Sequence, residues 1–331
     1  MKILLFGISG NCGKYCAKRF IQDGHTVVGV SRSSLKQEID GLQTIHGDIT
    51  QKSFVSNLPK DFDLVVNFAG VQPSILMTSE NTDLERTLHS YVDVNMLGTF
   101  NVLEFVRKNH IKTYVYATTH RDIELSWKQG VFLKNDEPIN INYQGDHSMY
   151  AISKTTGKMM GDYYCQAFGT RVFNLRLPMM FLIPDDPHYL KDGKPTLMPF
   201  LKLIKKAMNN DNLEIWGNKE LKRDYVHVEN LYSLIKLTSK SNLSGGTFCV
   251  GTGEAVTTER FVKAIGKEFN PDASFNRYVF KPDSITYKCA VYDVTEQKKL
   301  LGYEPILLSD MLKLLHNEII QGGFLEKWKW K

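Results

Sequence analysis

Short apolar segments alternate with helical segments along the first half of the chain. The strand-like segments read ILLFG, HTVVGVS, LQTIHGDI, LVVNFAG, TYVYATT and RVFNLRLP. Helical patterns lie between several of them, from about Lys14 to Asp23, from about Asp83 to Lys108, and in the segment that carries Tyr150. Apolar strands separated by helices are typical of a parallel sheet that is covered on both faces. We therefore expect an α/β fold with a doubly wound parallel sheet.

A glycine-rich loop connects the first expected strand to the first expected helix. Gly7, Gly10 and Gly13 form the pattern GxxGxxG in this loop. Glycines at such a junction permit a tight turn and the close approach of a pyrophosphate, whose charge meets the N-terminal amides of the next helix. The alternative is a turn with a purely structural role. In an alternating α/β chain the loop predicts a Rossmann-type dinucleotide site.

The regular alternation of strand-like and helical segments ends at Pro178. The stretch IPDDPHYLKDGKPT predicts a loop, and irregular mixed segments follow it. We therefore expect a smaller mixed C-terminal lobe beside the sheet domain. The sheet domain is expected to comprise residues 1–175, with about 222–252 returning to it, and the substrate-binding lobe to comprise 176–221 and 253–331.

Composition argues against several classes of protein. The 331 residues, 42% of them hydrophobic, can bury a full core. The net charge of +5 has no long run of Lys or Arg behind it, so we expect no nucleic-acid partner. Five scattered cysteines suggest neither a disulfide framework nor a metal site. The first apolar run ends too early for a signal peptide and no stretch could span a bilayer, so we expect a cytoplasmic protein.

Tyr150 and Lys154 stand four residues apart in the helical segment SMYAISK. Side chains at i and i+4 share one helix face, so the phenol and the ammonium could belong to one site. The alternative is a tyrosine packed on the core with a lysine stem beside it. The spacing alone leaves both interpretations open.

Further motifs follow the glycine loop in a fixed order: HGDIT, NFAG, VNMLGTFNVLE, YATTH, SMYAISK, RDYVHVENL and FCVGTGEAVT. Together they resemble the extended short-chain dehydrogenase/reductases, in particular the NAD(P)-dependent epimerase/dehydratase family, which acts largely on nucleotide sugars. The resemblance covers most of the chain. It implies a set of cofactor-binding residues: Gly7, Gly10, Asn11, Cys12, Gly13, Ser31, Arg32, Asp48, Ile49, Phe68, Ala69, Gly70, Asn95, Tyr150, Lys154 and Pro178.

The same resemblance implies the catalytic residues. Tyr150 would exchange a proton with a sugar hydroxyl or keto oxygen, and Lys154 would favour its phenolate form. Thr119, or its neighbour Thr118, would hydrogen-bond the same oxygen. Either threonine could instead reflect the β-propensity of a strand end.

Substrate binding is expected at Arg223, which matches the family arginine that holds the diphosphate and could instead pair with Asp224. Thr119 would also contact the substrate. The chain departs from the family in reading Met179-Met180 where a Gly-Pro usually follows. A 4,6-dehydratase is disfavoured, because His120 and Arg121 replace the Asp-Glu pair that follows the threonine in that subgroup. His120 and His147 receive no role.

The second strand ends in Ser31-Arg32-Ser33-Ser34, with no acidic residue before Glu38. Arg32 suits the 2′-phosphate of NADP, so NADP is expected in preference to NAD; the alternative is a solvated arginine. We expect a homodimeric nucleotide-sugar epimerase or 4-ketoreductase with a nucleoside-diphosphate sugar as substrate. Two alternatives are an NADPH-dependent reductase of a non-nucleotide carbonyl compound and a non-catalytic NADP-binding sensor.

Overall fold

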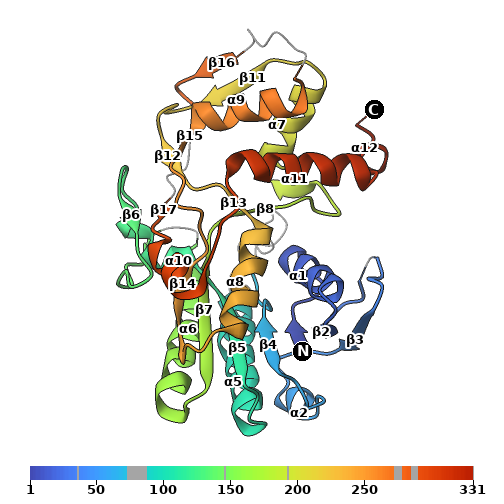
Figure 1. The fold of residues 1–331 in the computed structure, drawn as a ribbon, viewed down its shortest axis with the longest axis vertical. Coiled ribbons are helices and arrows are strands. Elements are labelled where there is room, and N and C mark those ends of the chain that lie inside the picture. Colours follow the sequence, from blue (N-terminus) through green and yellow to red (C-terminus); the bar gives the residue numbers. More distant parts are fainter. Residues whose placement is uncertain are drawn as a thin grey trace.

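A parallel sheet forms the centre of the computed structural model, which describes residues 1–35, 37–72, 88–144, 147–191, 194–271, 278–284 and 290–330. In this described part of the chain, seven parallel strands pair in the order β14-β7-β5-β4-β1-β2-β3 (Figure 1). They are β1 (Lys2–Phe6), β2 (Thr26–Ser31), β3 (Leu42–His46), β4 (Leu64–Asn67), β5 (Thr113–Thr119), β7 (Arg171–Leu177) and β14 (Gly245–Cys249). The expected doubly wound parallel sheet is confirmed, and each strand-like segment of the sequence supplies one of its strands.

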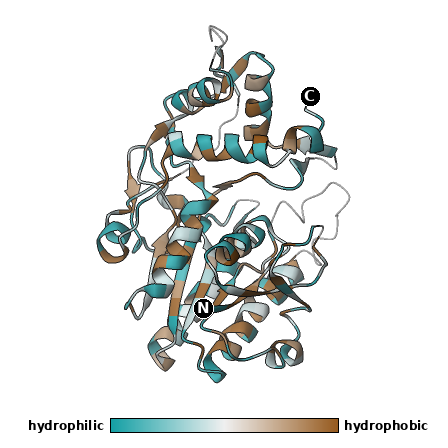
Figure 2. Cartoon of the chain, turned by 45° about the vertical axis from the view of Figure 1, so that its right-hand side comes forward, coloured by the Kyte–Doolittle hydropathy of each residue, from teal (hydrophilic) through white to brown (hydrophobic). Residues whose placement is uncertain are grey.

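Helices cover both faces of the sheet, as the apolar strands require. They are α1 (Asn11–Gln22), α2 (Lys52–Ser56), the π-helix η1 (Tyr91–Gly98), α5 (Thr99–Lys108), α6 (Ser148–Phe168) and α8 (Val228–Lys240). Strand β1 shows the alternation: Ile3 and Leu5 share a buried cluster with residues of α1 and α8, and Leu4 and Phe6 share another with residues of α5 and α6. Hydrophobic and hydrophilic residues alternate along the helices (Figure 2).

A third buried cluster lies in the C-terminal half of the chain, above the sheet in Figure 1. It is built mainly on α7 (Pro199–Met208), α9 (Thr258–Phe269), α11 (Leu308–Gln321) and α12 (Phe324–Lys327). Strands β11 (Leu213–Trp216) and β16 (Tyr278–Lys281) pair beside it. The remaining elements connect this part to the sheet: the 3₁₀ helix η2 (His120–Ser126), β6 (Phe132–Leu133), β8 (Met180–Phe181), β9 (His188–Lys191), β10 (Lys194–Leu197), β12 (Lys222–Arg223), β13 (Val226–His227), β15 (Val256–Thr257), β17 (Val291–Tyr292) and α10 (Thr295–Leu301).

Three local expectations need correction. The first helix begins at Asn11, directly after Gly10, and not at Lys14. The expected helix from Asp83 starts partly outside the described residues, and its middle is the π-helix η1 and not an α-helix. The Pro/Asp-rich loop contains an antiparallel pair of strands, β9 with β10. Tyr189 and Thr196 lie opposite each other in this pair, and aromatic and β-branched residues favour strands.

Candidate active site at the carboxyl edge of the sheet

Two glycines of the loop between β1 and α1 are required by the protein's own packing. Gly7 has φ +81°, and a Cβ atom there would lie 2.7 Å from the Ala69 nitrogen. A Cβ atom at Gly13 would lie 2.3 Å from the Gly7 carbonyl oxygen. Both positions exclude a side chain.

Gly10 differs from its two neighbours in the motif. It has φ −79° and ψ 157°, which any residue adopts, and its Cβ would lie 3.4 Å from the Gly7 oxygen, close to ordinary contact. Gly10 precedes α1, whose first turn contains no acidic residue and, within the described chain, receives no side-chain cap. The first amides of α1 are therefore free to meet an anion. These residues fit a dinucleotide pyrophosphate.

Asn95 ties together the elements around the loop. From the π-helix it accepts a hydrogen bond from the Val71 amide at 2.8 Å and donates to Ser153 Oγ on α6 at 2.9 Å. A Cβ atom at Gly70 would lie 3.1 Å from Asn95 Oδ1 and 3.6 Å from Lys154 Nζ. A π-helix often marks a functional site, since it re-aims one side chain. Asn95 thus holds the backbone that follows β4 next to Lys154.

Thr119 and Tyr150 meet where β5 ends beside the first turn of α6. The Thr119 oxygen accepts a hydrogen bond from the Arg121 amide at 3.1 Å, so its own hydrogen is free for a donation. A hydrogen bond from Thr119 lowers the pKa of Tyr150, but the larger effect is burial, which raises that pKa to about 12. The two residues predicted to share the substrate oxygen are therefore adjacent.

Lys154 is buried, with 4% of its surface exposed. Its ammonium lies 4.2 Å from the centre of the Tyr116 ring. Burial lowers the pKa of Lys154 to about 7. The expectation that Lys154 brings the Tyr150 pKa down is not met in the protein alone, because desolvation outweighs the effect of the neighbouring groups and favours the neutral form of both side chains.

Thr118 has a different environment from Thr119. Its side chain is buried, and its hydroxyl donates to the Lys154 carbonyl at 3.5 Å. This long contact braces β5 against α6. Of the two candidate threonines, Thr119 is the one that the structure joins to Tyr150.

The other expected cofactor residues lie around the loop. Ser31 Oγ donates to the Ser33 carbonyl at 2.6 Å, and Arg32 is exposed at the end of β2. Asp48 accepts from the Thr50 amide at 2.9 Å in a turn. The rest follow strand ends or open α1: Asn11, Cys12, Ile49, Phe68, Ala69 and Pro178.

Arg223 lies on β12, with its guanidinium 5.9 Å from the centre of the Tyr225 ring. The alternative partner, Asp224, is engaged elsewhere: its carboxylate accepts from the amides of Thr252 at 2.9 Å and Gly253 at 3.2 Å. Burial raises the pKa of Asp224 to about 6. Asp224 thus organises the turn after β14.

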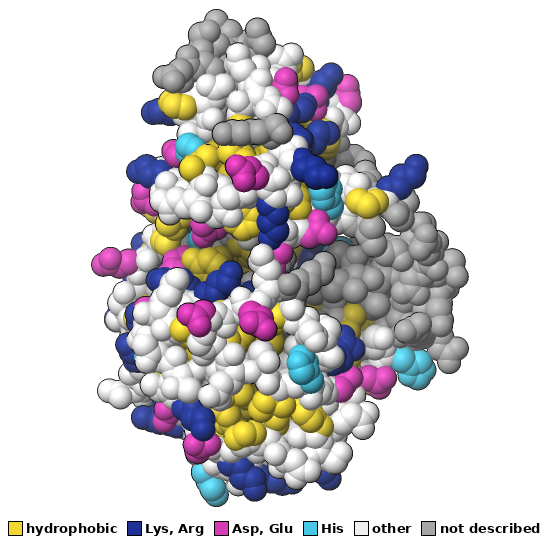
Figure 3. Space-filling model, turned by 90° about the vertical axis from the view of Figure 1, so that its right-hand side faces the viewer, with side chains coloured by type: hydrophobic (Ala, Val, Ile, Leu, Met, Phe, Trp, Pro, Cys, Tyr) yellow, Lys and Arg dark blue, Asp and Glu magenta, His cyan; other side chains and the backbone are white. Residues whose placement is uncertain are grey.

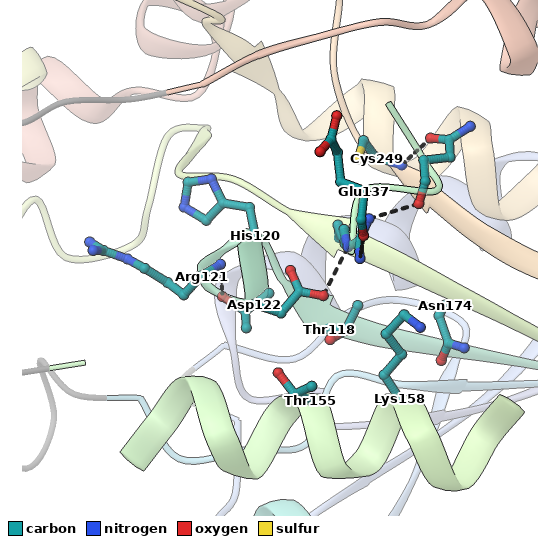
Figure 4. A network of polar contacts seen from close by, with 12 residues as sticks. Thr118, His120, Arg121, Asp122, Glu137, Thr155, Lys158, Asn174 and Cys249 are labelled. Carbon is teal, nitrogen blue, oxygen red and sulfur yellow. Dashed lines mark hydrogen bonds and ion pairs between the residues drawn. The ribbon is translucent and has the colours of Figure 1, made fainter. Parts of the chain in front are cut away.

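A buried polar network lies behind the threonines and was not expected. Arg176 Nε donates to Asp122 Oδ2 at 2.9 Å, and its other nitrogens donate to the carbonyls of Asn135 and Glu137 (Figure 4). His120 lies next to it, with Nδ1 2.6 Å from the Tyr292 hydroxyl, and burial lowers its pKa to about 3. These contacts join residues far apart in sequence, so no local pattern could have indicated them.

Two features are absent from the described residues. No group of His, Cys, Asp or Glu side chains there could hold a metal ion. None of the helices described combines the length and the apolar character needed to cross a bilayer. The face drawn in Figure 3 carries acidic and basic side chains interspersed, without a continuous basic surface.

Comparisons with known proteins agree with this geometry. The profile of the NAD dependent epimerase/dehydratase family matches residues 3–251. The uncharacterized UDP-glucose epimerase YtcB of Bacillus subtilis is 24% identical, over 92% of this chain and 93% of that protein. Protein CapI of Staphylococcus aureus is 24% identical, over 86% of this chain and 88% of CapI.

Solved structures share the fold. UDP-glucose 4-epimerase from Thermotoga maritima, solved with UDP-glucose, superposes with a TM-score of 0.75 at 20% identity, covering 97% of this chain and 99% of the other. UDP-glucuronic acid 4-epimerase from Bacillus cereus, solved with NAD, gives a TM-score of 0.71 at 19% identity, covering 97% of both. Because the family profile matches well over half of the chain, this protein belongs to the NAD dependent epimerase/dehydratase family.

Proposed function

We propose that the protein is a nicotinamide-dependent nucleotide-sugar epimerase or 4-ketoreductase. The observation that carries the proposal is the convergence of three side chains where β5 packs against α6: Thr119 at the end of β5, and Tyr150 and buried Lys154 on α6, at the sheet edge that also holds the glycine loop. A phenol, a hydroxyl and an amine are the groups that a proton transfer to and from a sugar oxygen needs. Relatives named for UDP-glucose and UDP-glucuronate epimerisation support a nucleotide sugar as the substrate.

Each of these side chains has a role in this proposal. When bound, the nicotinamide cofactor accepts or returns a hydride at the sugar carbon. Tyr150 takes the proton of the sugar hydroxyl on oxidation and gives a proton to the carbonyl oxygen on reduction. Thr119 positions that oxygen, and Lys154, protonated in the complex with the bound ligands, would place positive charge near the phenol and the cofactor ribose. Gly10 and the first amides of α1 hold the pyrophosphate.

Substrate recognition is assigned to the C-terminal part of the chain. Arg223 would bind the diphosphate, since a guanidinium forks onto phosphate oxygens and Asp224 is occupied by the turn at Thr252. We also propose that residues 176–221 and 253–331 form the substrate-binding lobe, with Arg223 in the segment that returns from this lobe to the sheet domain.

NADP is proposed as the preferred cofactor, because Arg32 is exposed at the end of β2 and no acidic residue precedes Glu38. Five similar solved structures contain NAD, so the choice needs a direct test. NADPH should bind at least about tenfold more tightly than NADH, equivalent to about 1.4 kcal/mol, and Arg32→Ala should remove most of the difference. Arg260→Ala, on α9, is the control. Equal affinities in the wild-type protein would refute the preference.

A homodimer is proposed from the surface of η1, α5 and α6, where α5 packs against α6. Large apolar side chains are exposed there: Val92, Leu97, Phe100, Met159 and Tyr163. Such a patch is typical of an interaction surface. Light scattering should give twice the chain mass, and a double substitution Phe100→Glu and Tyr163→Glu should give the monomer.

The function itself is tested by incubating the purified protein with a panel of nucleotide sugars, with and without reduced cofactor. An epimerase interconverts two sugars without consuming cofactor, whereas a ketoreductase consumes NADPH in proportion to product. Turnover of simple carbonyl compounds alone would favour the non-nucleotide reductase. Cofactor binding with no turnover at all would favour the sensor.

A further inference from the structure

Arg121 is the first basic side chain after the strand that ends at Thr119. Its amide donates to Thr119 Oγ at 3.1 Å, which fixes its backbone next to the catalytic pair. Its positive charge lowers the pKa of Tyr150, although burial has the larger effect and raises that pKa. Figure 4 shows its side chain extending away from Asp122 and along α6 beyond Thr155. In this direction α6 leads back to Tyr150.

The guanidinium of Arg121 is held in place by two neighbours, but only one of its nitrogens donates a hydrogen bond to a described residue. Nη1 donates to Glu124 Oε2 at 2.8 Å, and the group lies 5.3 Å from the centre of the Trp127 ring. Among the residues that the structure describes, neither Nε nor Nη2 of Arg121 has an acceptor. About a quarter of the side chain is exposed. One edge of the guanidinium, with two donors, is therefore open.

Arg107 provides the comparison within the same chain. It too pairs with a glutamate three residues away and lies over an aromatic ring, Phe168, at 5.0 Å. However, Arg107 uses both Nε and Nη2 on the two oxygens of Glu104, at 2.8 and 3.1 Å. That is the full two-point contact between a guanidinium and a carboxylate. In Arg121 the corresponding atoms, Nε and Nη2, are available to bind another carboxylate.

A second unsatisfied donor lies in the same place. The indole nitrogen of Trp127 is buried and has no partner among the described residues. A buried donor without an acceptor costs about 1–3 kcal/mol, and such costs are concentrated at functional sites. The ring centres of Trp127 and His120 lie 4.6 Å apart, so the indole beneath Arg121 packs against a buried neighbour.

We propose that Arg121 binds a carboxylate carried by the sugar, which makes a nucleoside diphosphate uronic acid the preferred substrate. The inference rests on the proposed function. If Thr119 and Tyr150 act on the oxygen at C4, the neighbouring side chain Arg121 lies near a substituent of the adjacent carbon. In a hexuronic acid the carboxylate is attached to C5, next to C4. A planar guanidinium edge with two donors binds this group at two points and gains little from a neutral hydroxymethyl group.

The test compares UDP-glucuronic acid with UDP-glucose, which differ in the proposed group alone. Binding is measured by calorimetry and turnover by product analysis, for the full-length wild-type protein, Arg121→Ala and the control Arg107→Ala. Arg121→Ala should weaken binding of UDP-glucuronic acid and lower its kcat/KM about 10- to 100-fold. The effect on UDP-glucose should stay below about threefold, and Arg107→Ala should change neither. Arg121→Gln keeps the polar stem and replaces Arg121→Ala if that variant does not fold.

Two outcomes would overturn the inference while leaving the proposed function intact. An equal loss with both sugars would place Arg121 at the diphosphate or in the scaffold. A wild-type protein that uses UDP-glucose at least as well as UDP-glucuronic acid would exclude selection by a carboxylate. Failure of the wild-type protein to bind or convert either sugar would refute the proposed function and the inference with it.

Discussion

Replacing Lys154 by methionine should remove activity and stabilise the fold at neutral pH. Lys154 is buried and its pKa is about 7 in the folded protein, whereas an unfolded lysine has a pKa of about 10.4. Between these two values the unfolded chain holds a proton that the folded chain has lost. The stability of the wild-type protein therefore rises with pH across this window. Methionine has a similar shape and no charge, so the variant lacks this dependence.

The size of the effect follows from the two pKa values. The burial cost of Lys154 is fully present below pH 7, at about 4 to 5 kcal/mol, falls to about 2 kcal/mol near pH 9, and vanishes above about pH 10.5. With an unfolding entropy of about 2.1 cal/mol/K per residue, this 331-residue chain gains about 1.4 °C per kcal/mol. Lys154→Met should therefore raise the melting temperature at pH 7 by up to about 7 °C.

The assay is thermal unfolding followed by fluorescence from pH 6 to pH 10.5, on protein freed of dinucleotide, since a bound ligand adds its own stabilisation. Lys158→Met is the control, because Lys158 lies one turn further along α6 and forms an ion pair with Asp162 at 2.7 Å. It should not raise the melting temperature. If the difference between wild type and Lys154→Met were independent of pH, the assigned burial of a neutral lysine would be refuted.

Four further substitutions test the site. Tyr150→Phe should leave the fold and cofactor affinity unchanged and lower turnover about a hundredfold or more, because it removes the proton-transfer oxygen alone; near-normal turnover in steady-state assays would contradict the role. Arg223→Ala should raise KM more than it lowers kcat, since a diphosphate contact is remote from the reacting carbon; loss of soluble protein would indicate a structural role instead. Gly10→Val should abolish dinucleotide binding, measured by fluorescence titration, with a small change in melting temperature, whereas Gly7→Ala should destabilise the fold itself.

The sheet and the glycine loop were predictable because both depend on local sequence. Apolar runs of four to seven residues set the strands, and the positive φ of Gly7 requires a glycine whatever the rest of the fold does. Tyr150 and Lys154 were predictable for the same reason, since four residues of helix place them on one face. Each of these inferences rests on local backbone geometry and not on contacts between distant residues.

The parts that were missed depend on contacts between distant residues. The π-helix is held by Asn95, whose partners Val71 and Ser153 are 24 and 58 residues away. Arg176 and Asp122 form their buried pair across 54 residues. The sequence shows a lysine near Tyr150 but not the burial of both groups, which raises the pKa of Tyr150 in the protein without ligands. Tertiary packing, and not propensity, decides these features.

Burial determines the protonation of Tyr150 and Lys154 in the protein without ligands. Desolvation raises the pKa of Tyr150 and lowers that of Lys154, so near pH 8 the protein alone holds the phenol protonated and most of the amine neutral. A protonated phenol is no general base, so whatever lowers the pKa of Tyr150 must come from outside these buried residues, such as the charge of a bound ligand. We therefore expect the proposed proton exchange at Tyr150 to require the bound ligands.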